Sequence, residues 1–524
     1  MLKKLFVPLL FLFAVQLQAQ TWADDVACIV YTHCANCHSP GNIGPFPLMN
    51  YAEAFDARFS IQNAVTEREM PPWKAEVGYG DHIGKRTLTD EEVALIDAWV
   101  NNGAPEGMAG NAPPPPVFNS PEEIQNPDLT VKIPAYHIPD NLPNDLYRVF
   151  AIPATLPDDR FITGIEVVPG NRAVVHHVLV YQDSTGQALS QDAADPEPGY
   201  TAFGGIGVFG AELIGAWVPG SGAEHYPPNM GVHLPQNTAI VLQIHYPVDA
   251  AGQWDSTHVN FTLSDGSLRQ VSIAPVLNHG LSMVNGPLSI PPNQVKTFEE
   301  TYTVPIQATV LAIAPHAHLI CTSMKAFGVT LQGDTIPLVD IPEWDFHWQG
   351  AYKFQQPIKL NPLTKLYGFA TYDNTSGNPD NPNSPPQTVS VGEATTDEMM
   401  LFYFTYTAYQ SGDENMVIDT TSHKPHYLDC ETHTVISGTD EQPHLEGFTL
   451  YPNPAAGFIT IEKRTEAAAR LRLLDFSGHL VLEEKLSGSS EQISLLGLPE
   501  GIYAASLFLE NGQLVGTQRV VVLR

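Results

Sequence analysis

The sequence has few cysteines, few basic residues and no long apolar stretch beyond its N-terminus. Five cysteines in 524 residues are too few for a disulfide-rich scaffold. Lysine and arginine number 25 against 57 aspartates and glutamates, which gives a net charge of −32. Because nucleic-acid binding needs a basic surface, this balance argues against DNA or RNA as a partner. After residue 20 no segment approaches the roughly 20 continuous apolar residues of a transmembrane helix, so we predict no membrane span.

The N-terminus has the pattern of a cleaved secretory signal. Lys3 and Lys4 precede the apolar stretch Leu5–Val15, and residues 16–20 are mostly polar. A short basic segment followed by a brief apolar run is typical of signal peptides. We therefore expect the mature chain to begin near residue 21 and to be exported.

Proline-rich and loosely patterned stretches divide the rest of the chain. Residues 111–126 contain five prolines and predict a stiff, extended linker. A second, looser boundary lies near residues 438–446, and about 500 mature residues suit three or four domains. We predict a signal peptide (1–20), a first unit (21–108), a proline-rich linker (109–127), two central domains (128–270 and 271–437) and a C-terminal domain (446–524).

The pattern of apolar residues changes from helical to strand-like at the linker. Thr89 followed by Glu92 predicts a capped helix over residues 89–102 that ends at Gly103. Beyond the linker, short runs rich in Val, Ile, Thr and Tyr alternate with Pro and Gly, which is typical of β-sandwiches. The predicted fold class is mainly β, with one small helical domain. Examples of the predicted strands are residues 173–181, 239–246, 309–314 and 399–406.

The most specific local motif is Cys34-Ala-Asn-Cys37-His38. Two thiols at this spacing can form thioether bonds to the vinyl groups of a haem, and the adjacent histidine can bind the iron. A redox-active pair of cysteines is the alternative. Met70, before two prolines, is the candidate second iron ligand, and Met49 is its rival. Residues 28–105 resemble the small c-type cytochrome domains that are fused to larger bacterial redox proteins, which implies a haem c cofactor.

Histidines in the central region form a second, dispersed set. His176 and His177 are adjacent, His245 ends an apolar run, and His316 and His318 alternate. Alternation along a strand puts His316 and His318 on one face, where both imidazoles can bind one metal ion. Adjacent histidines point to opposite faces of an ideal strand, so joint binding by His176 and His177 requires a bulge or a strand end.

Taken in order, the motifs HH, LQIHY, HAH and DEM in residues 128–430 resemble those of the copper type II, ascorbate-dependent monooxygenases, the family of the peptidylglycine alpha-hydroxylating and dopamine beta-monooxygenases. The resemblance implies two jelly-roll β-sandwiches, each with one copper ion, facing each other across a solvent-filled cleft. It implies His176, His177 and His245 as ligands of an electron-transfer copper. It also implies His316, His318 and Met399 as ligands of the catalytic copper, where dioxygen binds.

Ligand chemistry agrees with this resemblance. Imidazole suits both oxidation states of copper, whereas a thioether such as that of Met399 favours Cu(I). We expect Met400 to point to the opposite face, into the core. Gln243 shares a face with His245 and is either a hydrogen-bonding partner of that ligand or a surface residue. The remaining central histidines match no ligand motif and are predicted to be structural or surface residues: His225, His233, His279 and His347.

Two departures from the family pattern bear on substrate and stability. Met400 and Leu401 follow the DEM triplet where the animal enzymes have Cys and Asn, so a peptide carboxylate substrate is doubtful. Cys321 replaces an expected glycine. It shares the second central domain with Cys430, and the two are candidates for a disulfide in an oxidising compartment.

These features together predict an exported monooxygenase that hydroxylates a C–H bond of a small organic substrate with dioxygen. The haem would pass electrons to the copper ions, and an ascorbate-like reductant or a redox protein would supply them. A haem and copper protein that only transfers electrons or stores copper is one alternative, and a non-catalytic adhesive surface protein is another.

The C-terminal stretch has its own signature. Residues 448–524 open with FTLYPNP and then alternate short apolar strands with turns, which predicts a small β-sandwich. They resemble the C-terminal sorting domain of the type IX secretion system, which implies the secretion machinery as a partner and a Gram-negative host of the Bacteroidetes type. An accessory module such as a carbohydrate-binding domain is the alternative.

Overall fold

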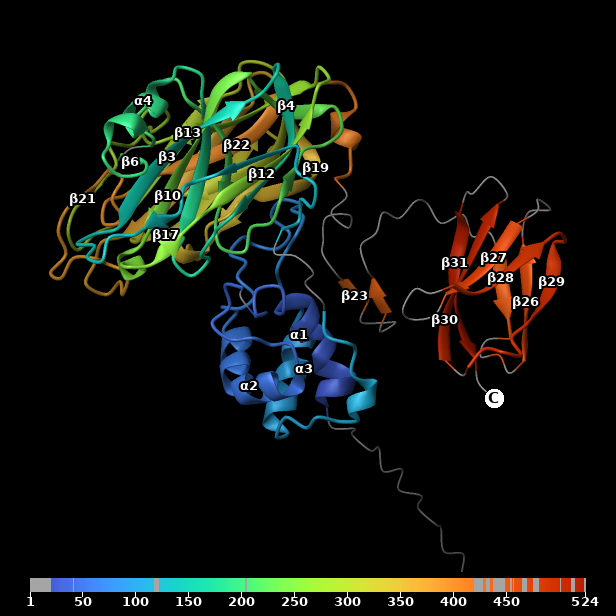
Figure 1. The fold of residues 1–524 in the computed structure, drawn as a ribbon. Helices are drawn as coiled ribbons and strands as arrows, with labels where there is room; N and C mark the ends of the chain where they lie inside the picture. The colour runs from blue at the N-terminus through green and yellow to red at the C-terminus, as the bar shows by residue number, and fades with distance from the viewer. Residues whose placement is uncertain are drawn as a thin grey trace, which may run out of the picture. The chain divides into compact units, whose positions relative to one another are not determined.

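The computed structural model describes most of the chain, and the predicted signal peptide, of which residues 1–19 are not described, lies almost wholly outside it. The described residues are 20–40, 42–116, 122–202, 205–418, 427–429, 434–436, 448–452, 455, 457–463, 469–474, 480–499, 501–509 and 514–522. They form two compact units, Met1–Ser437 and Gly438–Arg524 (Figure 1). Among the described helices, none is both long and apolar enough to span a membrane.

The chain begins with a small helical domain around a core of its own (Figure 1). Trp22 and Trp99 are buried at its centre. Thr89 caps the last main helix with the reciprocal Glu92 hydrogen bonds that the sequence predicts. Its helices are η1 (Trp22–Val26), α1 (Ala27–His33), α2 (Tyr51–Thr66) and α3 (Asp90–Asn101), followed by the short turn η2 (Ala109–Asn111).

The region after the linker is mainly β, as predicted. Its first sandwich encloses a core to which both sheets contribute, including Val178, Ile244 and Phe261. One sheet has the order β6 (Tyr200–Thr201), β3 (Leu146–Thr155), β10 (Asn237–Tyr246), β5 (His177–Asp183), β7 (Glu212–Trp217). The facing layer is β1 (Leu129–Lys132), β12 (His258–Ser264), β4 (Arg160–Val168), β9 (Met230–Leu234), with β8 (Glu224–His225) beside β4. Smaller elements are α4 (Gln187–Ala194), η3 (Val248–Ala250), and the pair β2 (Tyr136–His137) and β11 (Trp254–Asp255).

A second sandwich follows and encloses a second core, to which Phe298, Met324, Phe402 and Phe404 contribute. Its layers are β13 (Arg269–Asn278), β22 (Leu401–Ala408), β16 (Ala308–His316), β19 (Tyr352–Leu360), and, facing them, β15 (Val295–Thr303), β20 (Lys365–Asp373), β17 (Cys321–Val329), β18 (Thr335–Ile341). Smaller elements are the pair β14 (Ser289–Ile290) and β21 (Val389–Ser390) and the turns η4 (Phe346–Trp348) and η5 (Asp413–Asn415). The later pair β23 (Tyr427–Asp429) and β24 (Thr434–Ile436) lies outside the sandwich, where β23 contacts α1 of the helical domain.

One sheet runs through both sandwiches. β9 of the first pairs in parallel with β13 of the second, where Met230 lies opposite Arg269 and Gly231 opposite Gln270. On its other side, β9 pairs with β4. A Cβ on Gly231 would lie 2.7 Å from the carbonyl oxygen of Ile162 in β4, so the close approach of β4 and β9 requires glycine. The shared sheet therefore fixes the orientation of one sandwich relative to the other.

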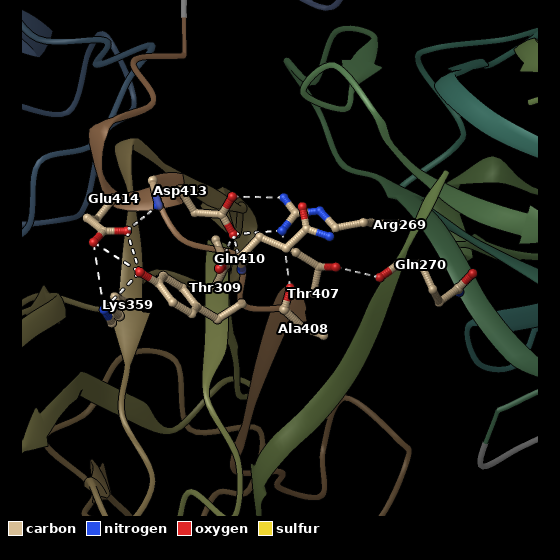
Figure 2. Close-up of polar contacts among 11 residues, drawn as sticks. Arg269, Gln270, Thr309, Lys359, Thr407, Ala408, Gln410, Asp413 and Glu414 are labelled. Atoms are coloured by element: carbon tan, nitrogen blue, oxygen red, sulfur yellow. Dashed lines mark hydrogen bonds and ion pairs between the residues drawn. The ribbon is translucent and has the colours of Figure 1, made fainter. Parts of the chain in front are cut away.

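Polar contacts hold the edge of this junction (Figure 2). Arg269 donates from Nη1 and Nη2 to the two carboxylate oxygens of Asp413, at 2.8 and 3.0 Å. Asp413 also accepts hydrogen bonds from the hydroxyl of Thr309 and the backbone N–H of Gln410. The turn η5 is thereby fixed to the first residue of β13.

A segment of the helical domain, residues 70–86, lies along the second sandwich; we call it the strap. The backbone N–H of Glu76 donates to the carbonyl of Asp340, and that of Ile83 to the carbonyl of Lys353. The buried ring of His82 donates from Nε2 to the carbonyl of Leu338 at 2.8 Å. These contacts attach the CxxCH-bearing domain to the second sandwich.

The C-terminal unit has its own core and two small sheets (Figure 1). One contains β25 (Phe448–Tyr451), β26 (Phe458–Lys463) and β29 (Ser490–Ser494). The other contains β28 (Leu480–Leu486), β27 (Ala469–Leu474), β30 (Gly501–Leu509) and β31 (Leu514–Val522). This is the small β-sandwich that the sequence predicts.

Candidate metal centres

Three histidines of the first sandwich meet at one point. The ligand atoms of His176, His177 and His245 lie within 4.8 Å of one another. Nδ1 of His177 is 3.2 Å from Nδ1 of His176 and 3.4 Å from Nδ1 of His245. A metal–nitrogen distance of about 2.0 Å puts the nitrogens of a tetrahedral site about 3.3 Å apart. The arrangement fits a single metal ion.

Strand β5 begins at His177, four residues later than the predicted start at residue 173, because residues 172–174 form a turn. His176 therefore lies just outside the strand, where its side chain is free of the alternation of the sheet. Its backbone N–H donates to the carbonyl of His245 at 3.0 Å. Of the two possibilities that the sequence left open, a bulge or a strand end, the protein uses the strand end.

The imidazole of His245 is held from two sides. Its Nε2 donates to the carboxylate of Asp145 at 3.0 Å, and the ring of Tyr147 stacks on it with centroids 4.4 Å apart. The hydrogen bond to His245 lowers the pKa of Asp145. With the proton on Nε2, the Nδ1 lone pair faces the other two histidines. Sequence analysis did not identify Asp145 or Tyr147 as partners of His245, because a single Asp or Tyr at the start of another strand forms no recognisable motif.

The second group lies at the ends of two neighbouring strands. His316 is the last residue of β16, His318 lies just beyond it, and Met399 comes just before β22. The rings of His316 and His318 are 5.2 Å apart and nearly perpendicular. β16 and β22 pair with His316 opposite Leu401, so Met399 lies near the two histidines.

Both imidazoles of this group have Nδ1 occupied. Nδ1 of His316 donates to the side-chain oxygen of Gln349 at 2.6 Å, and Nδ1 of His318 donates to the carbonyl of Asp397 at 3.1 Å. Their Nε2 atoms remain available for a metal ion, whereas the first group presents Nδ1. Glu398 accepts hydrogen bonds from the backbone N–H groups of His318 and Ile320 and thereby ties the two motifs together.

Burial keeps four of the five candidate ligand histidines in these two groups neutral. It is the main cause that lowers the pKa of His176 to about 4 and that of His318 to about 3. The pKa values of His177 and His316 are lowered for the same reason. Metal binding requires a neutral imidazole with a free lone pair, and these four side chains meet the first condition at neutral pH.

Both groups face one cavity of about 1160 Å³. His177 lines it from the first sandwich, and His316, His318 and Met399 line it from the second. The side chain of Met399 is 7% exposed, and the hydroxyl of Tyr372 donates to its carbonyl. Met400 is fully buried in the second core with Phe402 and Phe404, as predicted.

Cys37 of the CxxCH motif lines the same cavity. The motif lies in the turn that follows α1, which ends at His33. Cys34 and Cys37 are free thiols, and burial raises the pKa of Cys34 to about 12. Nδ1 of His38 donates to the carbonyl of Phe46 at 2.9 Å, which leaves Nε2 free. Such a hydrogen bond to a backbone carbonyl is usual for a metal-binding histidine, so these residues fit a covalently bound haem.

The two candidate iron-binding methionines lie at different places in the helical domain. Met49 packs against the helical core. Met70 is half-buried at the start of the strap, just after α2 ends at Thr66. Met70 stays the predicted second iron ligand, with Met49 as its rival.

Several other expectations have a definite outcome. Gln243 is buried and donates to the carbonyls of Ala202 and Gly205, so it contacts a loop instead of His245. Cys321 is a free, buried thiol, so the predicted disulfide between Cys321 and Cys430 is wrong. The reason is that Cys321 opens β17 inside the second core. Cys430 itself lies outside the described residues.

The four histidines without a ligand motif divide into two pairs. His225 and His279 line the cavity. Nδ1 of His279 is 3.2 Å from the carbonyl of Met400, and burial lowers its pKa. Nε2 of His233 lies 3.3 Å from a carboxylate oxygen of Asp159, and Nδ1 of His347 lies 3.3 Å from a carboxylate oxygen of Asp345.

A match to a known family covers the region of the first histidine group. Residues 129–251 match the N-terminal domain of the copper type II ascorbate-dependent monooxygenases. The chain therefore carries a copper type II monooxygenase domain. This copper domain contains His176, His177 and His245. The chain is also 24% identical over 339 residues to a tyramine beta-hydroxylase of Caenorhabditis briggsae, which covers 60% of this chain and 52% of the relative, or about half its length.

The C-terminal unit matches a secretion system C-terminal sorting domain over residues 449–523. Such a domain indicates export by the type IX system of Bacteroidetes, as predicted, to the cell surface or the medium. Among solved structures, similarity extends to the type IX surface component PorZ of Porphyromonas gingivalis, with 20% identity, a TM-score of 0.14, and 17% of this chain and 13% of that one covered. A β-glucuronidase of Ruminococcus gnavus has 9% identity, a TM-score of 0.12, and 44% and 36% covered. Scores this low carry no argument about function.

Proposed function

We propose that the chain is an exported copper monooxygenase that hydroxylates a C–H bond of a small organic substrate with dioxygen. The observation that carries the proposal is that His177 from the first histidine group and His316, His318 and Met399 from the second line one cavity. A substrate in that cavity is within reach of both groups. The copper domain match and the hydroxylase relative support the same activity.

In this proposal His176, His177 and His245 bind one copper ion, and His316, His318 and Met399 bind the other. The thioether of Met399 favours Cu(I), the oxidation state that reacts with dioxygen. When bound, the two ions supply the redox chemistry, each delivering one of the two electrons that monooxygenation consumes. The protein holds the ligands neutral and oriented through Asp145, Gln349 and the carbonyl of Asp397.

We propose further that Cys34 and Cys37 hold a c-type haem, with His38 and Met70 as its iron ligands. The haem would supply electrons one at a time, received from an ascorbate-like reductant or a redox protein. Free Nε2 of His38 and the location of Cys37 on the shared cavity support this. Replacing both cysteines by alanine should abolish the haem absorption bands of the exported protein, whereas replacing the free, buried Cys321 should leave them unchanged.

The cavity favours an amine substrate, the class that the name of the tyramine beta-hydroxylase relative also indicates. Glu393 lines the cavity with three tyrosines: Tyr147, Tyr181 and Tyr403. Burial and then the charge of Glu393 raise the pKa of Tyr403 to about 12. A carboxylate among aromatic rings binds an ammonium group by charge and by cation–π attraction.

Met399→Ala tests the proposed activity. The variant should lose hydroxylation of an aryl ethylamine such as tyramine while it keeps the haem spectrum and the first copper ion. Met400→Leu, in the adjacent core position, is the control and should keep activity. Full hydroxylation by Met399→Ala would refute the assignment. Wild-type protein that consumes dioxygen without a hydroxylated product would refute the enzyme and favour an electron-transfer protein.

A further inference from the structure

One aromatic ring contacts both histidine groups. The phenyl ring of Phe346 stacks on the imidazole of His176, with centroids 5.3 Å apart and planes 18° from parallel. The same ring meets the imidazole of His318 edge-on, with centroids 6.0 Å apart at 89°. His176 belongs to the first sandwich and His318 to the second. Phe346 therefore lies between the two candidate copper centres and touches a ligand of each.

The turn that carries Phe346 is anchored to the second sandwich on both sides. Before it, the backbone N–H of Trp344 donates to the carbonyl of Thr322 at 2.9 Å. After it, Gln349 donates from its side-chain nitrogen to the carbonyl of Phe346 at 3.0 Å and accepts the 2.6 Å hydrogen bond from His316. The location of the ring is thus tied to both histidines of the second group.

The helical domain holds the same turn. Asp345 begins the turn and accepts a hydrogen bond from the backbone N–H of His347 at 2.9 Å. Lys74 of the strap lies 3.4 Å from the carboxylate of Asp345, and both side chains are largely buried. Three parts of the chain, namely the two sandwiches and the CxxCH-bearing domain, therefore meet at η4.

We propose that Phe346 is a positioning residue that sets the separation of the two copper centres. The proposal rests on the proposed function, because it takes both histidine groups as copper sites. Because the ring packs face-on against His176 and edge-on against His318, it fixes both the distance and the angle between these two imidazoles. Without the ring, His176 loses the surface on which it stacks, and the spacing of the two groups would vary.

The separation of two bound Cu(II) ions can be measured without turnover, from the dipolar broadening of the electron paramagnetic resonance spectrum of the oxidised full-length protein. Wild type and Phe346→Tyr, which keeps the ring, should show one well-defined coupling. Phe346→Leu and Phe346→Ala should show a weaker and more widely distributed coupling with two copper ions still bound. Phe327→Ala is the matched control, since Phe327 is a half-buried phenylalanine of the same sandwich that stacks on Tyr367 and does not line the cavity.

The outcomes separate this proposal from the proposed function. Wild-type coupling in Phe346→Leu and Phe346→Ala, with both ions bound, would overturn the positioning role and leave the monooxygenase proposal intact. A changed coupling in these variants, in a wild type that binds two copper ions and hydroxylates nothing, would support the positioning role and refute the activity. Fewer than two copper ions bound by the wild type would overturn both. Phe346→Leu keeps an apolar side chain of similar reach, so the comparison holds even if Phe346→Ala does not fold.

Discussion

The carboxylate of Asp145 accepts the Nε2 proton of His245 at 3.0 Å and so decides which nitrogen of that imidazole can bind a metal ion. Asp145 precedes β3 and His245 is near the end of β10, so the pairing of these strands brings them together. The carboxylate also accepts the backbone N–H of Val248, which fixes its orientation. The relationship has a measurable consequence for copper affinity.

Asp145→Asn should weaken copper binding at the first histidine group. An amide is a weaker acceptor than a carboxylate, so it holds the proton on Nε2 less firmly and makes Nδ1 a poorer ligand. Loss of such a partner typically costs about 10- to 100-fold in metal affinity. Titration against a Cu(I) chelator, in a Met399→Ala background so that only the first group is measured, gives the value. Asp249→Asn, an exposed change nearby, is the control. Equal affinity in both variants would show that Asp145 has no role in binding.

Glu393→Gln should impair use of an amine substrate. The change keeps the size of the side chain and removes one of the three carboxylates that line the cavity. We expect KM for a primary aryl ethylamine to rise about tenfold or more, since a charge-assisted hydrogen bond contributes about 1.5–3 kcal/mol. An uncharged substrate of the same shape, with a hydroxyl in place of the amine, should show no such rise. A parallel change for both substrates would argue that Glu393 acts on the fold and not on the ammonium group.

Breaking the ion pair between Arg269 and Asp413 (Figure 2) should destabilise the joined sandwiches. The side chain of Asp413 is 7% exposed and that of Arg269 is 16% exposed, so removing one partner leaves a largely buried charge. Arg269→Met should lower the free energy of unfolding by about 2–4 kcal/mol. Arg160→Met, which removes a guanidinium that pairs with the exposed Asp158, should cost about 1 kcal/mol or less. Denaturant unfolding followed by tryptophan fluorescence would test the difference, and equal losses would contradict it.

Glu300 should make the fold less stable in alkali. Its carboxyl is fully buried in β15 without a hydrogen-bond partner among the described residues, and burial raises its pKa to about 9. The folded state thus keeps a proton that the unfolded chain releases near pH 4.3, so stability falls as pH rises between these values. The slope is at most about 1.4 kcal/mol per pH unit.

Glu300→Gln removes this proton linkage. The variant should unfold at a higher temperature than wild type at pH 8, and the difference should vanish near pH 4. Glu299→Gln, a half-buried neighbour on the other face of the strand, should follow the wild-type profile. A parallel pH profile for Glu300→Gln and wild type would show that the carboxyl is ionised in the folded protein.

Removal of the C-terminal unit should stop export and leave the rest of the chain folded. Unit Met1–Ser437 has its own cores, and the sorting domain match lies wholly in the other unit. A chain that ends at Ser437 should accumulate inside the cell envelope, with absorption bands and copper content like those of the full-length protein. Immunoblots of the medium and of intact cells would measure this. Normal secretion of the shortened chain would contradict the assignment of the tail.

The sequence predicts the local features of this protein well. A capped helix at Thr89, strands at the alternating runs and a core location for Met400 follow from short-range periodicity and capping. The strand that begins at His177 is the exception, since the residues before it are apolar yet form a turn. Apolar composition alone does not distinguish a strand from a buried turn.

Partners from other elements could not be predicted, because their residues have no fixed spacing from the histidines. Asp145, Gln349 and Phe346 each contact a candidate ligand, and each comes from a turn or a strand end that the sheet pairing brings there. Gln243 shows the converse: its place on the strand suggested a link to His245, and tertiary packing turned it to the carbonyls of Ala202 and Gly205.

The sequence by itself predicted the candidate copper ligands and haem-binding thiols and determined where the sorting domain lies, because these depend on side-chain chemistry and short spacing. Only the tertiary structure decided that the two histidine groups and Cys37 share a cavity, and that a single phenyl ring lies between the groups. The physical reason is the sheet that runs through both sandwiches: its β9–β13 pairing sets distances between residues that are more than a hundred positions apart in the chain.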